Sequence, residues 1–80
     1  MGTAPTAEES ARSILAIFRD RNVKAGESLR AGPVNRDFIS NGGAALDFDA
    51  GLEYAADMGW LLVVGAVIRL TDRGVAQMMP

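Results

Sequence analysis

The stretch that decides the fold is GLEYAADMGWLLVVGAVIRLTDRG, residues 51–74. Its second half contains two short runs rich in aliphatic residues, 60–64 and 67–71, which are separated by Gly65-Ala66. Such runs favour β-strands, and glycine at the first turn position suits a two-residue type II′ turn. The sequence therefore predicts a β-hairpin.

The register of this hairpin divides its side chains between two faces. A two-residue turn pairs Leu61 with Leu70 on the face that we expect to pack on helices, and it pairs Val63 with Ile68 there too. The opposite face then carries four apolar side chains: Trp60, Leu62, Val64 and Val67. A contiguous apolar patch on a small monomer usually marks a partner surface. The alternative is that the C-terminal segment, residues 75–79, folds over part of it.

A helix is predicted directly before the hairpin. We expect Asp47 to cap it and Gly59 to end it. Its inward stripe consists of Phe48, Leu52, Ala55 and Ala56. Carboxylates recur at four-residue steps on the other side: Asp49, Glu53 and Asp57. This spacing places them in one acidic stripe that faces away from the apolar side of the helix.

The first helix of the chain is predicted from its cap. Thr6-Ala7-Glu8-Glu9 forms a capping box, in which the threonine and the last glutamate each accept an amide hydrogen bond from the other. Apolar residues then recur at helical spacing, with Ile17 on the flank of the stripe: Ala11, Ile14, Leu15 and Phe18. We expect this helix to end near Arg21 or Asn22.

Three short elements complete the prediction. Residues 27–30 alternate as in an edge strand, and Gly32-Pro33 suits the start of a second helix that Asn41-Gly42-Gly43 closes. Thr71 is placed to cap a last short helix that runs to Met78. The predicted order is helix, short strand, helix, helix, hairpin, short helix.

Within this predicted order of elements, residues 51–74 resemble the third helix and the wing of the small winged helix-turn-helix proteins of prokaryotes. In that family a helix ends at a glycine followed by a large residue, here Gly59-Trp60. A strand pair follows and runs into a Leu-Thr-x-x-Gly step, here residues 70–74. The resemblance covers about residues 7–78. Two features depart from the family pattern: residues 41–46 are longer than the usual tight turn, and the wing is short.

The resemblance implies an α+β fold, a winged helix-turn-helix with three helices, a short β-hairpin wing and a short C-terminal helix. We expect a flexible tail at residues 1–6 and one domain at residues 7–80, because 80 residues leave no room for a second core. The resemblance also implies that the third helix enters the major groove of DNA and that the wing contacts the DNA backbone or the minor groove.

The amino-acid composition excludes several classes of function. The chain has no Cys and no His, so the usual general base, thiolate and soft metal ligands are missing. We expect no enzyme activity, no cofactor and no metal, and a cytoplasmic protein without a membrane segment. The formal net charge is −2, whereas nucleic-acid binders are usually basic.

The charge pattern weakens the DNA hypothesis. No basic residue stands between Arg36 and Arg69, and the turn of the wing holds no charge. Phosphate contacts need Lys and Arg, so an acidic third helix would repel DNA more than it reads it.

We therefore favour a non-catalytic, regulatory interaction module that acts through protein contacts, either with a second copy or with a basic partner. Its candidate residues are Asp49, Glu53, Asp57, Trp60, Leu62, Val64 and Val67. The alternative is a DNA-binding transcription regulator that contacts DNA through its basic first half or as a dimer. The candidates for that are Arg12, Arg19, Arg21, Lys24, Arg30 and Arg36. These cations also fit an ordinary solvated surface, with partners such as Glu8, Asp20 and Glu27.

Overall fold

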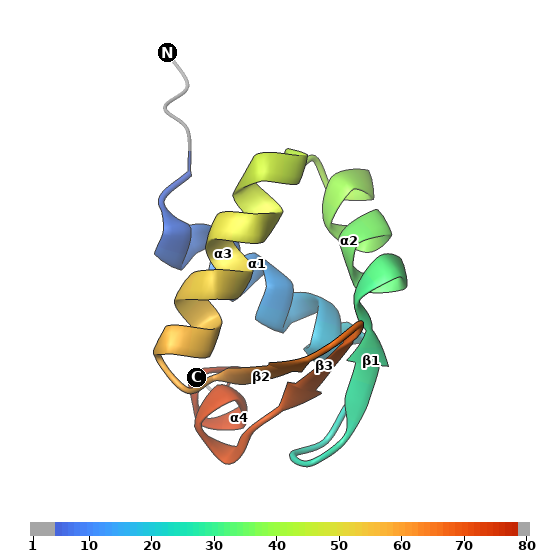
Figure 1. The fold of residues 1–80 in the computed structure, drawn as a ribbon, viewed down its shortest axis with the longest axis vertical. Coiled ribbons are helices and arrows are strands. Elements are labelled where there is room, and N and C mark those ends of the chain that lie inside the picture. The colour runs from blue at the N-terminus through green and yellow to red at the C-terminus, as the bar shows by residue number, and fades with distance from the viewer. Residues whose placement is uncertain (1–4, 79–80) are drawn as a thin grey trace.

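The computed structural model describes residues 5–78 and forms an α+β domain (Figure 1). The described residues form α1 (Ala7–Asp20), β1 (Ser28–Arg30), α2 (Ala31–Ser40), α3 (Ala45–Asp57), β2 (Leu61–Val64), β3 (Val67–Leu70) and α4 (Asp72–Met78). The strands make one antiparallel sheet in the order β1-β3-β2, so β2 is an edge strand. Figure 1 shows α1, α2 and α3 gathered on one side of this sheet.

The hairpin has the predicted register. Leu61 pairs with Leu70 and Val64 pairs with Val67 across β2 and β3. Gly65 has a φ of 60°, and Ala66 stays outside the left-handed region, as a type II′ turn requires. The short strand β1 pairs with the other side of β3, which confirms the predicted edge strand.

The first three helices end in the same way. Each is followed by a left-handed residue: Asn22 (φ 57°), Gly42 (φ 97°) and Gly59 (φ 76°). The next amide bonds back to the carbonyl five residues earlier, at 3.0, 3.0 and 2.8 Å respectively. This is the Schellman arrangement, which satisfies the last carbonyls of a helix and turns the chain sharply. The three helices can therefore fold back on one another between Ala7 and Asp57.

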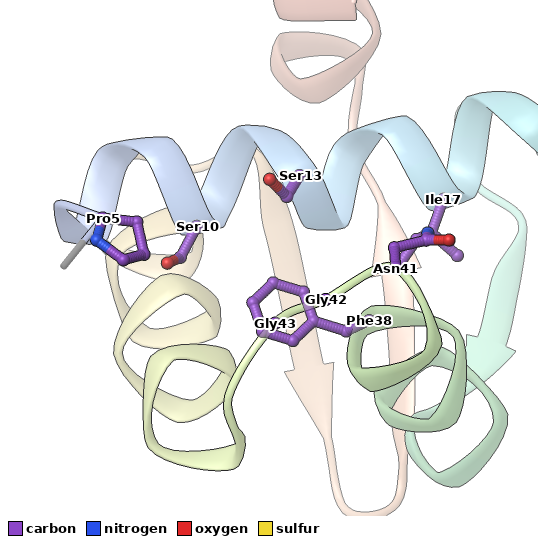
Figure 2. A pocket seen from close by; sticks show the side chains of 8 residues that line it. All are labelled: Pro5, Ser10, Ser13, Ile17, Phe38, Asn41, Gly42 and Gly43. Atoms are coloured by element: carbon purple, nitrogen blue, oxygen red, sulfur yellow. The ribbon is translucent and has the colours of Figure 1, made fainter. Parts of the chain in front are cut away.

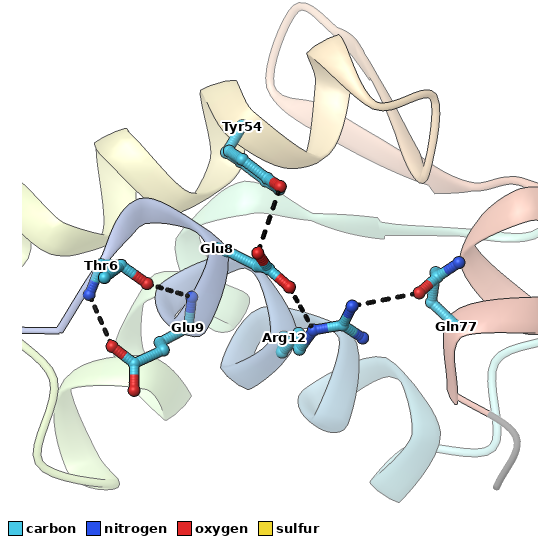
Figure 3. Close-up of polar contacts among 6 residues, drawn as sticks. All are labelled: Thr6, Glu8, Glu9, Arg12, Tyr54 and Gln77. Carbon is cyan, nitrogen blue, oxygen red and sulfur yellow. Dashed lines mark hydrogen bonds and ion pairs between the residues drawn. The ribbon is translucent and has the colours of Figure 1, made fainter.

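Side chains close the N-termini of α1 and α4. Thr6 N donates to Glu9 Oε1 at 2.8 Å, and Glu9 N donates to Thr6 Oγ1 at 3.1 Å, so the predicted capping box is present (Figure 3). Gly74 N donates to Thr71 Oγ1 at 3.0 Å, which confirms the predicted cap of the last helix.

The N-terminus of α3 differs from the prediction. Asp47 is not the cap: the cap position is Ala44, three residues earlier, which makes no side-chain hydrogen bond, and α3 begins at Ala45. Alanine and leucine at positions 45 and 46 are strong helix formers, and Phe48 N already bonds Ala44 O at 3.1 Å. Asp47 then lies in the first turn, where the helix dipole favours a carboxylate.

The core is centred on α1, which contributes five buried apolar residues: Ala11, Ile14, Leu15, Ile17 and Phe18. It packs most extensively against α3. On α3 the inward stripe was predicted with one error, because Ala56 is exposed and Gly51 is buried in its place. A Cβ atom on Gly51 would lie 2.7 Å from Ser10 Cβ and 2.8 Å from Ala11 N. The glycine thus permits the close crossing of the two helices.

Replacing Gly51 by alanine should destabilise the protein by about 1–3 kcal/mol, because α1 and α3 must separate to admit the methyl group. Gly32→Ala is the matched control, since Gly32 also lies in a helix but has open space where its Cβ would be. The control should be neutral or stabilising by up to about 1 kcal/mol. Urea unfolding followed by Trp60 fluorescence measures both. Equal stabilities for the two variants would contradict the close crossing.

Candidate interaction surface

The outward side of α3 carries the acidic stripe. Asp49, Glu53 and Asp57 are all exposed, while Phe48, Gly51 and Ala55 on the opposite side are buried. Within residues 5–78 none of the three carboxylates forms an ion pair. The predicted stripe therefore lies on the surface of the domain with its charges uncompensated.

A shallow groove runs beside this stripe. It has a volume of about 270 Å³ and is lined by Ala7, Ala50, Glu53, Tyr54 and Asp57. Glu53 and Asp57 thus line a groove whose other side chains belong to two alanines and a tyrosine. Such a surface suits the stem and charged head of a lysine or arginine from another molecule.

The outer face of the hairpin is apolar and uncovered. Leu62, Val64 and Val67 expose 49%, 59% and 38% of their surface. The helix α4 does not fold over them: it packs against α1, and Val75 and Met78 contact the core cluster. Met79 lies outside the described residues. Among residues 5–78, the proposed covering of this patch by the C-terminal segment is therefore wrong.

Trp60 does not belong to the outer face, and its prediction as an interaction residue is wrong. Only 4% of its surface is exposed. The ring packs edge-on against Tyr54, with centroids 5.5 Å apart, and the Arg12 guanidinium carbon lies 4.9 Å from the Trp60 ring centroid. The residue precedes β2 and belongs to the Schellman turn that ends α3, so strand alternation does not apply to it.

Val63 was expected to be covered by the helices, but 41% of its surface is exposed. Its partner Ile68, on the central strand, is fully buried. The difference arises because β2 is the edge strand: the helices reach the central strand and the start of β2, where Leu61 is buried, but leave the middle of β2 open.

Three of the six first-half cations have partners within the domain. Arg12 bonds Glu8 at 3.1 Å and Gln77 at 3.2 Å, and Tyr54 donates to the same glutamate at 3.4 Å (Figure 3). Arg21 makes two bonds to Asp37, at 2.9 and 2.6 Å.

Arg19 lies 3.4 Å from Asp20, a long contact between two exposed side chains. Glu27 does not pair with a cation but accepts the backbone amide of Lys24 at 2.8 Å. Lys24, Arg30 and Arg36 form no ion pair among residues 5–78. The expected ion pairing on the surface is thus present for three of the six cations in the first half of the chain, Arg12, Arg19 and Arg21.

Two arginines share the outer face of the sheet. Arg30 stands opposite Val67, and Arg69 stands between Ser28 and Leu62. The sequence alone shows Arg69 opposite Leu62, but nothing in it reveals that β1 pairs with β3 and brings Arg30 to the same face. The outer face is therefore mixed, with two cations beside three aliphatic side chains.

A second hollow lies between α1 and the turn that joins α2 to α3 (Figure 2). Its volume is about 190 Å³, and it is lined by Pro5, Ser10, Ser13, Ile17, Phe38, Asn41, Gly42 and Gly43. Ser10 is buried, and its hydroxyl has no hydrogen-bond partner within the described residues. No charged side chain lines the hollow, so it offers little to hold an ionic ligand.

Residues 5–78 contain no cluster of three or more His, Cys, Asp or Glu side chains with the arrangement of a metal site. No helix among them has the length and apolarity needed to cross a bilayer.

Comparison with known proteins adds no relative: no protein-family model, no curated protein and no solved structure matches this chain.

Ser10→Ala should be more stabilising than Ser13→Ala by about 1 kcal/mol in urea unfolding, because it removes a buried hydroxyl that has no partner. Both substitutions bring the same gain in helix propensity within α1, and Ser13 is exposed, so their difference isolates the effect of burial. A Ser10→Ala protein that is less stable than the control would show that the hydroxyl is satisfied by an ordered water.

Proposed function

We propose that this chain is a non-catalytic interaction module of the winged-helix type, in which α3 binds a basic segment of another protein. The fold assignment is supported by the order of elements, by the pairing of β1 with the hairpin, and by the position of α3 directly before the hairpin. In this fold α3 occupies the place of the helix that reads DNA. What that helix binds depends on its exposed side chains and not on the fold.

The observation that carries the proposal is the uncompensated acidic stripe. Asp49, Glu53 and Asp57 follow at steps of about 6 Å along the helix axis, so they present three negative charges over about 12 Å. Each is exposed and unpaired within residues 5–78. A basic helix or extended segment with a similar spacing would satisfy all three, and phosphate groups would be repelled.

The apolar outer face of the hairpin supports the same class of function. Leu62, Val64 and Val67 form a patch that a protein partner would remove from water, whereas DNA backbone contacts would gain little from it. Arg30 and Arg69 border the patch and give it polar groups for orientation.

The runner-up function is DNA contact through the first half of the chain. The cations that remain available for this contact are Lys24, Arg30 and Arg36, because they form no ion pair among the described residues. Arg12 and Arg21 are less available, because each already holds two hydrogen bonds within the domain.

Neutralising the stripe with Asp49→Asn, Glu53→Gln and Asp57→Asn together should weaken binding of a helical Lys-Leu-Ala peptide about tenfold. Three exposed ion pairs at roughly 0.5 kcal/mol each amount to that factor. The matched control is Asp20→Asn, Glu27→Gln and Asp72→Asn, which changes the net charge equally at exposed positions outside α3. It should bind within about twofold of the unchanged protein. Amide NMR titration at low salt measures the affinities and maps the contact.

A parallel titration with short duplex DNA separates the two candidate functions. The proposal expects no DNA-induced shifts on α3 or the hairpin. Shifts that cluster there and disappear as salt rises would refute it, and shifts confined to the region of Lys24, Arg30 and Arg36 would favour the runner-up.

A further inference from the structure

The strand β2 lies at the edge of the sheet and has backbone groups that face outward. The hydrogen bonds fix which backbone groups face outward: Thr71 N bonds Trp60 O at 3.2 Å across the hairpin. Because bonding alternates along an antiparallel pair, Leu62 and Val64 also bond β3, and the amide and carbonyl of Leu61 and Val63 point away from the sheet. These outward groups have no partner within residues 5–78.

The edge also lacks the usual protection. Exposed edge strands are normally guarded by lysine, proline, a bulge or a covering segment, because an unprotected edge can pair with another strand. From Leu61 to Ile68 the chain holds none of these residues, and the ladder runs without a bulge from Leu61 to Val64. Leu61 is buried at the start of the strand, but Leu62, Val63 and Val64 are exposed, so the edge of β2 is open to a partner from Leu62 to Val64.

We infer that β2 pairs antiparallel with β2 of a second copy of this chain, around a two-fold axis through Val63. The amide of each Val63 donates to the carbonyl of the other, and Leu62 stands opposite Val64 of the partner subunit. The two sheets join into one of six strands. The inference rests on the proposed function only in treating the hairpin as a protein-binding surface; it does not depend on α3.

A second copy fits this edge because identical uncharged strands bring no like charges together. Arg69 lies on β3, next to β2, and Arg30 lies on β1, on the far side of β3. The two β2 strands at the centre of the dimer therefore separate the arginines of one copy from those of the other.

The pairing has a second consequence for the apolar patch. Leu62 and Val64 of both copies come together on the outer face and form one continuous aliphatic strip. A four-residue strand pair buries less than the roughly 1,000 Å² of a stable interface, so we expect a weak dimer with a dissociation constant on the order of 0.1 mM.

Two measurements on the unmodified chain test the inference: sedimentation velocity and amide hydrogen exchange. Each is made at protein concentrations below and above the expected dissociation constant. We expect the sedimenting mass to rise toward a dimer and the Val63 amide to gain protection with concentration. The amides of Leu62 and Val64 serve as internal controls, since they bond within the hairpin and are protected at every concentration. No variant is needed for this measurement.

Val63→Pro removes the outward N–H without touching a bond inside the hairpin, and proline is tolerated on edge strands. It should weaken dimerisation at least about tenfold. Val63→Thr keeps the N–H and the β-branched shape and should dimerise within about threefold of the unchanged chain. The neutralised variant of α3 should dimerise normally, which separates this inference from the proposed function.

Two outcomes overturn the inference. The first is a chain that stays monomeric at millimolar concentration. The second is a dimer in which the Val63 amide remains unprotected, which would place the contact away from the edge of β2.

Discussion

Trp60 links four elements, and the arrangement of the domain depends on it. Its amide closes the last turn of α3 by bonding Ala55 O at 2.8 Å. Its carbonyl accepts the Thr71 hydroxyl at 2.8 Å, and the same hydroxyl caps α4. Its ring lies between Tyr54 of α3 and Arg12 of α1. One buried residue therefore fixes the angle at which α3 leaves the core and the hairpin begins.

This junction also explains why the charges are distributed unevenly over the surface. Arg12 is drawn toward the Trp60 ring and Glu8, and Arg21 is held by Asp37, so these first-half cations are compensated inside the domain. The crossing of α1 and α3 at Gly51 turns the other side of α3 to solvent. Its carboxylates are left without partners among the described residues, and the proposed basic partner follows from this imbalance.

The hairpin offers a different kind of surface from α3. The helix presents charge, which orients a partner and is weakened by salt, whereas the hairpin presents aliphatic side chains and backbone groups that have no partner among residues 5–78. An edge strand provides hydrogen bonds of fixed direction, so its partner must be another strand. The two surfaces are thus suited to different partners, and one domain has room for both.

Local patterns predicted most of the fold because the interactions behind them are local. The capping box at Thr6, the cap at Thr71 and the two-residue turn at Gly65 each involve residues within a few positions of one another. The same holds for the acidic stripe, since helical spacing alone places Asp49 and Glu53 on one side. The start of α3 was missed because intrinsic propensity at Ala45 competed with the preference of Asp47 for a cap, and local rules do not decide between them.

What the sequence by itself determined is therefore the set of elements, their register in the hairpin and the sign of the charge on α3. Only the tertiary structure decided that Trp60 is buried, that Val63 is open and that Arg30 shares a face with Arg69. Each of these depends on which strand lies at the edge and which segments meet across the sheet. Such contacts join residues far apart in the chain, and no local spacing encodes them.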